Sequence, residues 1–203
     1  MVMTMTKVKL ALISIPITLV PYLALFTLAT IFFSVDVPFF SMIMESVFNN
    51  NALILIGVLF IYCIAVVNLS CIYFFVSINK SRDALAVAKT GMIIKLVQIP
   101  AYVLIFILSV FFIISVFTIP FTFGLFVIDC LSVFTTDLLI FSSVLISIKS
   151  EDIVFKDVAL LVFLQFVFCL DVIASVILYR KLKAIENKKM ILDTVSPLDA
   201  ECA

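Results

Sequence analysis

Three aspartates lie inside long apolar stretches of this chain, where a carboxyl group has little water to solvate it. They are Asp129, Asp137 and Asp171. A charge at the centre of a bilayer costs about 2.5–3.5 kcal/mol on insertion scales, so such residues usually face protein or water. We expect Asp137 and Asp171 to share a depth on two neighbouring, antiparallel membrane helices that contain no Lys or Arg. Burial disfavours a charged carboxyl, so the pair should hold at least one proton or bind a cation.

A stripe of small polar residues accompanies these acids on the helix expected over 124–148. At 100° per residue its members fall within about 60° of arc. They are Asp129, Ser132, Thr136, Ser143 and Ser147. Such a stripe allows membrane helices to pack closely and to hydrogen-bond across their interface, although it could also line a water-filled path. We favour packing, and we keep an ion or proton pathway through Asp137 and Asp171 as the alternative.

Enzyme chemistry finds little support in the residue types present. The chain has no His, so the Ser-His and Cys-His nucleophile systems are unavailable. Its three glycines cannot supply a phosphate-binding loop. The aspartates occur as VIDC, TTDL and CLDV, without the Gly-x-Gly-Asp sequence typical of intramembrane aspartyl proteases. Five Cys without a CxxC pair predict neither a zinc nor a haem site. We therefore expect no enzymatic activity, no metal and no cofactor.

The elements that would position these residues are membrane helices. Four apolar runs exceed or match the roughly 20 residues needed to cross a bilayer: 10–33, 52–78, 96–128 and 158–179. The first three contain no Asp, Glu, Lys or Arg, and Asp171 is the one charged residue of the fourth. Only 13% of the residues are charged, against about 25% in soluble domains. The chain is thus expected to be an integral membrane protein whose surroundings are the lipid bilayer. Its formal net charge of zero gives no basis for binding nucleic acid.

The expected fold is an all-α membrane bundle of about five transmembrane helices. Residues 1–78 would form an N-terminal pair with spans at 10–33 and 52–78, and Pro16 and Pro21 should kink the first of them. The intervening connector has an apolar pattern that predicts a short helix lying on the membrane. Residues 79–183 would form a three-helix module, and 184–203 a polar tail. The module's elements are an interfacial helix over 82–98, spans at 99–118, 124–148 and 158–179, and a turn at the breaker cluster 119–124.

Five crossings would leave the two termini on opposite sides of the membrane. With the N-terminus in the cytoplasm, eight Lys and Arg residues lie inside and the five of the C-terminal tail lie outside. The positive-inside rule favours this orientation only weakly, because so basic a tail would normally remain in the cytoplasm. An even number of crossings would remove the conflict.

Three stretches are similar to a family of small multi-pass membrane proteins from Firmicutes that is known as a domain of unknown function. They are AVAKTGMIIKLVQIPAYVLIFIL (86–108), FVIDC (126–130) and LQFVFCLDVIASVILYRKLK (164–183), and the resemblance covers about residues 82–183. It implies a multi-pass protein of the bacterial inner membrane and transfers no catalytic residue.

These observations predict a non-enzymatic structural or accessory subunit of the membrane. Its partner would be another membrane protein or a second copy of the chain. The alternative is a small transporter or ion pathway that uses Asp137 and Asp171.

Overall fold

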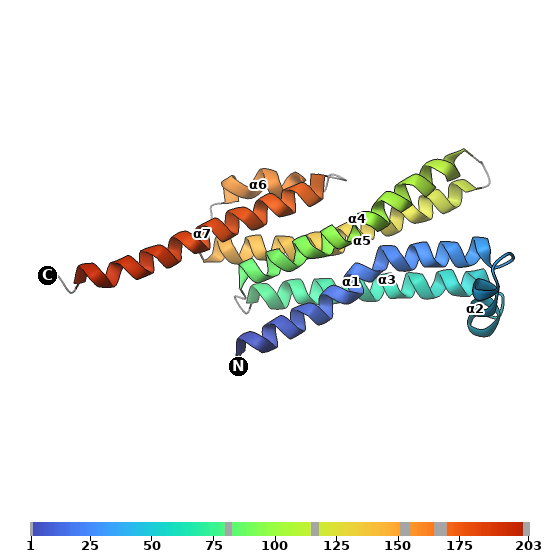
Figure 1. The fold of residues 1–203 in the computed structure, drawn as a ribbon, viewed down its shortest axis with the longest axis horizontal. Coiled ribbons are helices and arrows are strands. Elements are labelled where there is room, and N and C mark those ends of the chain that lie inside the picture. The colour runs from blue at the N-terminus through green and yellow to red at the C-terminus, as the bar shows by residue number, and fades with distance from the viewer. Residues whose placement is uncertain (1, 80–82, 115–117, 151–154, 165–169, 201–203) are drawn as a thin grey trace. The chain divides into compact units, whose positions relative to one another are not determined.

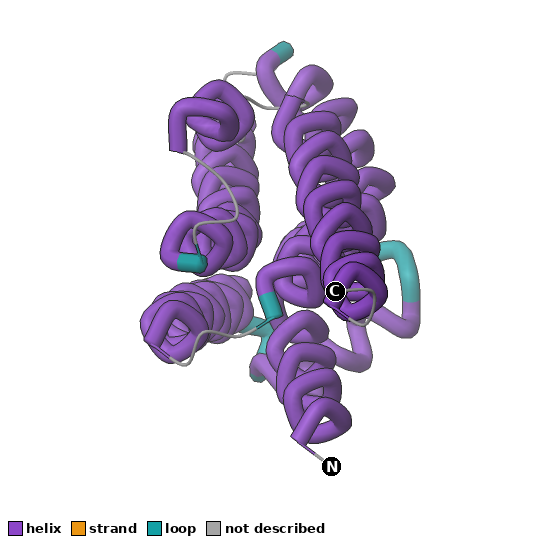
Figure 2. The backbone as a smooth tube through the Cα atoms, turned by 90° about the vertical axis from the view of Figure 1, so that its left-hand side faces the viewer, coloured by secondary structure: helices purple, strands orange, loops and turns teal. Residues whose placement is uncertain are grey.

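The chain is almost entirely helical. A computed structural model describes residues 2–79, 83–114, 118–150, 155–164 and 170–200, and no strand occurs among them (Figures 1 and 2). The helices are α1 (Val2–Phe33), α2 (Pro38–Phe48), α3 (Ala52–Asn79), α4 (Ala84–Ile113), α5 (Ile119–Lys149), α6 (Phe155–Leu164) and α7 (Leu170–Ala200). Within the described residues, four helical segments are long and apolar enough to cross a membrane: Leu12–Phe33, Ala52–Asn79, Ala84–Ile113 and Ile119–Lys149. The prediction of an all-α membrane bundle is confirmed.

Two prolines lie inside α1 without ending it. Figure 1 shows that the helix changes direction along its length, as Pro16 and Pro21 lead us to expect. Thr18 Oγ1 donates a hydrogen bond of 2.8 Å to Ser14 O one turn earlier, which keeps this hydroxyl satisfied within the helix. The carbonyl of Ile17, which Pro21 deprives of its ordinary helical donor, finds a partner on another helix, as described below.

The predicted connector helix is α2, which packs against α1. Pro38 occupies its first turn, where the missing N–H costs nothing. The Phe40 ring lies 6.0 Å from that of Phe26 on α1 and 6.4 Å from that of Phe33. Asn49 ends the helix in the left-handed conformation, with φ 49°, and its N–H donates to Met44 O. Asn tolerates this backbone conformation better than most residues, so the residues of the turn themselves account for the sharp turn into α3.

The turn between the third and fourth spans lies earlier than the breaker cluster 119–124 suggested. That cluster is the beginning of α5, and α4 ends at Ile113. A proline is favourable in the first turn of a helix, because its N–H would have no partner there in any case. Pro120 therefore starts a helix instead of breaking one. Residues 115–117, between the two helices, lie outside the described residues.

The predicted span over 158–179 is described as two helices instead of one. Residues 165–169 lie outside the described residues, and α6 and α7 on either side of them pack against each other. α6 has 10 residues, which is about 15 Å of helix and too short to cross a bilayer alone. α7 continues as helix to Ala200, so most of the expected polar tail is helical. Lys, Glu, Ala and Leu favour helix, which accounts for this extension.

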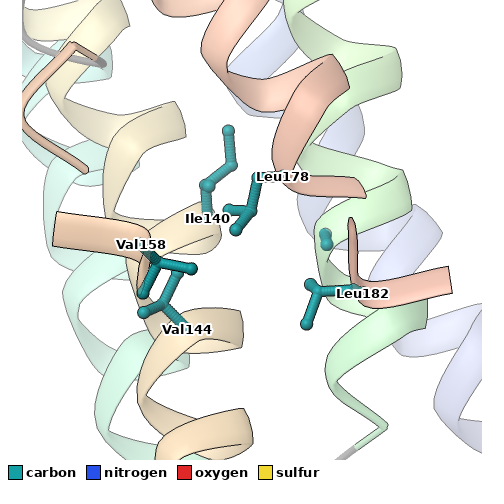
Figure 3. Close-up of a cluster of buried hydrophobic side chains, with 6 residues drawn as sticks. Ile140, Val144, Val158, Leu178 and Leu182 are labelled. Carbon is teal, nitrogen blue, oxygen red and sulfur yellow. The ribbon is translucent and has the colours of Figure 1, made fainter. Parts of the chain in front are cut away.

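The helices contribute to two compact units. The first contains Met1–Tyr73 and Ile94–Thr136, and the second contains Phe74–Ile93 and Asp137–Ala203. The core of the first unit includes Leu28, Ile105 and Leu125, beside stacked rings of Phe32 and Phe112. Figure 3 shows the core of the second unit, in which α4, α5, α6 and α7 all take part. Its members are Ala88, Ile140, Val144, Val158, Leu178 and Leu182.

α5 and α7 run in the same direction within the second unit. In Figure 3 the direction from Ile140 to Val144 along α5 is the same as the direction from Leu178 to Leu182 along α7. In Figure 1 the colour ramp from N- to C-terminus also runs the same way along both helices. The expectation of two antiparallel neighbours is therefore wrong. Its premise was that a short connector joins the two helices directly, whereas α6 lies between them in the chain.

Candidate functional site

Both acids of the predicted pair are buried in the second unit. Asp137 on α5 and Asp171 near the start of α7 are each 3% exposed. Asp137 precedes Ile140 of the shared core by three residues, and Asp171 precedes Leu178 by seven. Because the two helices run in the same direction, both carboxyls lie on the same side of this core, offset by roughly one helical turn, about 6 Å. Asp171 Oδ1 also accepts a 2.7 Å hydrogen bond from the N–H of Val172 in the first turn of α7.

The polar stripe of α5 faces protein along its whole length. Asp129 is 8% exposed, and the hydroxyl-bearing members Ser132, Thr136, Ser143 and Ser147 are all 2% exposed or less. α5 is also the most enclosed of the four candidate spans, with 61% of its most apolar window buried, against 22% for α3 and for α4. The stripe predicted from sequence is therefore the packed face of the most enclosed helix.

The hydroxyl groups of this face bond mainly to their own helix. Thr136 Oγ1 donates to Ser132 O at 3.1 Å and to Val133 O at 2.8 Å, and Ser143 Oγ donates to Ile140 O at 2.7 Å. Thr135 and Ser142, which the stripe did not include, do the same with Ser132 O and Leu139 O. A hydroxyl that donates back to its own helix needs no water. This pattern suits a dry helix contact better than a hydrated channel wall.

A glycine allows α4 to approach α5 closely in the second unit. A Cβ atom added to Gly91 would lie 2.6 Å from Ile140 Cγ1, well inside contact distance. Ile140 is 1% exposed and belongs to the core of Figure 3, so it has little room to move. Any side chain at position 91 would therefore force Ile140 or the helices to shift, and small residues are common where membrane helices meet.

A hydrogen-bonded cluster centred on Gln98 joins three helices of the first unit. Gln98 Nε2 donates to Ile17 O on α1 at 2.9 Å and to Ser132 Oγ on α5 at 3.2 Å. Tyr102 OH donates to Gln98 Oε1 at 2.9 Å and lies 3.1 Å from Ser132 Oγ. Gln98 and Ser132 are fully buried. Of this cluster the sequence singled out only Ser132.

The acceptor on α1 exists because of a proline. The N–H of residue 21 would normally donate to the carbonyl of Ile17, but Pro21 has no N–H. Gln98 supplies the missing donor from α4. A reciprocal bond runs from Tyr22 OH to Val97 O at 2.5 Å, in the turn of α4 that precedes Pro100. Tyr62 OH of α3 donates to Pro16 O at 2.8 Å. Side chains thus satisfy main-chain groups in the proline-disturbed turns of α1 and α4.

Lys95 is a buried lysine that the sequence did not lead us to expect. The interfacial helix predicted over 82–98 would have kept its ammonium near water, whereas the side chain is 0% exposed. α4 runs without interruption from Ala84, where Asp83 caps its first turn, so Lys95 lies about 17 Å into the helix. Lys95 follows Gly91 by four residues and precedes Gln98 by three, which places all three on one helix face. That spacing was the feature of the sequence from which the burial of Lys95 could have been predicted.

No group of three or more potential metal ligands of the His, Cys, Asp or Glu type occurs within the described residues. Comparison of the chain with protein-family models, with curated proteins and with solved structures finds no match. Arguments about function therefore rest on the geometry described above.

Proposed function

We propose that this multi-pass membrane protein is a non-enzymatic structural or accessory subunit, built around α5 as its main packing helix. The observation that carries the proposal is the packed polar face of α5, where buried hydroxyls donate to carbonyls of their own helix. Transport requires polar groups that exchange partners with water or substrate. Here those hydroxyls already donate hydrogen bonds to main-chain carbonyls and are buried from solvent, which favours a structural role over a transport pathway.

The charge distribution supports one orientation in the membrane. Four crossings by α1, α3, α4 and α5 return Lys149 to the side of the N-terminus. α7 runs in the direction of α5 and would deliver the C-terminal tail to that same side. Every Lys and Arg apart from the buried Lys95 then lies on one side, in the segments 7–9, 80–89, 149–156 and 180–189. The connectors on the other side, 34–51 and 114–118, carry none. The positive-inside rule then favours both termini in the cytoplasm.

A specific observation favours a second candidate function, a cation or proton pathway. Asp137 and Asp171 are buried carboxyls on two helices that share the second unit's core, and ionisable residues within membrane spans commonly mark ion paths. On this reading the two side chains would exchange a proton or a cation during turnover.

Flux through purified protein in liposomes separates the two functions. We expect vesicles containing the wild-type chain to show the same proton and monovalent-cation leak as empty vesicles, and Asp137→Asn and Asp171→Asn to alter only stability. A pH- or cation-dependent flux that either substitution abolishes would overturn the structural role and establish the pathway. Ser46→Cys, on the exposed surface of α2, is a matched control that should leave both flux and stability unchanged.

A further inference from the structure

α3 has two opposite faces with different surroundings. One face is buried and includes Cys63, Val66 and Ser70, each 2% exposed or less. The other face is open, with Ile54 at 47%, Ile61 at 68% and Ile72 at 62% exposure. At 100° per residue, the middle of the open face lies about 150° to 180° from the middle of the buried one. Among the described residues of the first unit, none covers this outward face of a membrane-spanning helix.

An amide side chain lies in the middle of the open face. Asn68 is exposed and falls within about 40° of arc of Ile54, Ile61 and Ile72. It sits near the middle of α3, which has 28 residues. Its Nδ2 donates to Ile64 O at 2.8 Å, and within the described part of the chain its Oδ1 accepts no hydrogen bond. Lipid tails offer no hydrogen-bond donor for that oxygen, so the amide is stabilised if another protein segment places a donor at the same depth in the membrane.

A second copy of this chain supplies such a partner by symmetry. Two copies inserted with the same topology have parallel α3 helices, and a two-fold axis along the membrane normal brings the two Asn68 residues to one depth. A carboxamide carries both donors and an acceptor, so two of them are complementary to each other. An unrelated partner would need a polar group placed at this depth independently.

The spacing along the open face also fits a two-helix contact. Ile54, Ile61 and Asn68 recur every seven residues, the repeat that keeps one seam of two parallel helices in register. β-Branched residues at such positions favour two strands, and a single Asn among them specifies register. Gly57 lies on the same face, and a Cβ added there would meet no atom within 4 Å. It leaves room for a neighbouring backbone to come close.

We propose that the outward face of α3 is the interface of a parallel homodimer, in which Asn68 of each copy hydrogen-bonds to Asn68 of the other. The inference does not depend on the function proposed above, since a transporter or a scaffold could equally dimerise in this way. It assigns different roles to the two faces of α3: the buried face holds the fold of one copy together, and the open face binds the second.

Fluorescence energy transfer between labelled full-length chains in lipid vesicles measures the dimer as the protein-to-lipid ratio is varied. We expect Asn68→Leu to weaken association about 3- to 30-fold, the range that interhelical hydrogen bonds in membranes give. Asn68→Gln, which keeps the amide, should retain most of the association. Both changes are at an exposed site, so the unfolding of the single chain should stay as in wild type.

Two matched glycines test the geometry. Gly57→Leu should weaken the dimer because the added side chain occupies the contact, while Gly124→Leu should not, although a Cβ at either position meets open space in the single chain. Disulfide formation at Ile61→Cys, in a chain whose own cysteines are replaced, should exceed that at Phe106→Cys on the exposed face of α4. A monomer at every ratio, a dimer insensitive to Asn68→Leu, or preferential cross-linking at position 106 would overturn the proposal.

Discussion

Replacing Gln98 with Leu should destabilise the protein, and the size of the effect should depend on Pro21. Gln98 donates a hydrogen bond to the carbonyl of Ile17, which lies four residues before Pro21. The substitution removes the two hydrogen bonds donated by Nε2 and the one accepted by Oε1. Interhelical hydrogen bonds in membrane proteins contribute about 0.6 kcal/mol each on average. The change also leaves the buried Ile17 carbonyl without its donor, at a cost of about 1 kcal/mol or more. We therefore expect a loss of about 2–3 kcal/mol in the free energy of unfolding.

The same substitution should cost less when residue 21 can donate. In the Pro21→Ala background, the N–H of the substituted residue can close the ordinary helical bond to Ile17 O. The part of the Gln98→Leu cost that comes from the orphaned carbonyl then disappears, so the two changes should couple by about 1 kcal/mol. Steric-trap unfolding of the purified full chain in mixed micelles gives the four free energies of this cycle.

Tyr102→Phe provides the control for that cycle. It removes the hydrogen bonds to Gln98 and Ser132, neither of which lies on α1, so its cost should be the same with Pro or Ala at position 21. If Gln98→Leu costs equal amounts in both backgrounds to within about 0.3 kcal/mol, the link between the proline and the glutamine is refuted.

Two further predictions concern packing and orientation. Gly91→Ala should destabilise the protein by about 1 kcal/mol, since overpacking against Ile140 costs about 1–3 kcal/mol and the gain in helix propensity returns about 1. In an Ile140→Ala background the same unfolding assay should find Gly91→Ala neutral or stabilising. An unchanged cost in that background would contradict the close approach of α4 to α5. A membrane-impermeant thiol reagent should label Cys202, which lies outside the described residues, only after cells are permeabilised, whereas Ser46→Cys in a Cys202→Ser chain should label in intact cells. Labelling of Cys202 in intact cells would instead restore five crossings.

The helical membrane fold could be read from the sequence because its signals are long and cumulative. Uncharged runs at 10–33 and 52–78 correspond to the candidate spans of α1 and α3. The signals that failed were short and ambiguous. Pro120 reads as a breaker or as a helix start, and only the position of the preceding helix end decides which. The apolar run over 158–179 has the length of a span, but α6 and α7 divide it.

The candidate site was predictable where helix periodicity alone defines a face, and less so where several helices meet. The stripe on α5 follows from spacing within one helix, so all five of its predicted members are buried. Gln98 bonds to residues 81 and 34 positions away, and no local pattern announces either contact. Lys95 was assigned to a membrane surface because charge usually marks a boundary, yet a lysine on the packed face of a helix can be enclosed by its neighbours.

The bond from Gln98 to Ile17 also has a consequence for biosynthesis. The ribosome makes the carbonyl of Ile17 81 residues before the side chain that satisfies it. At about 5–20 residues per second, the interval is roughly 4–16 s. During that time the first helix would carry a proline-interrupted turn that is not yet satisfied by α4. The first helix would therefore reach its final position in the bilayer only after α4 is inserted. The N-terminal span would be among the first elements synthesised and among the last to adopt its final packing.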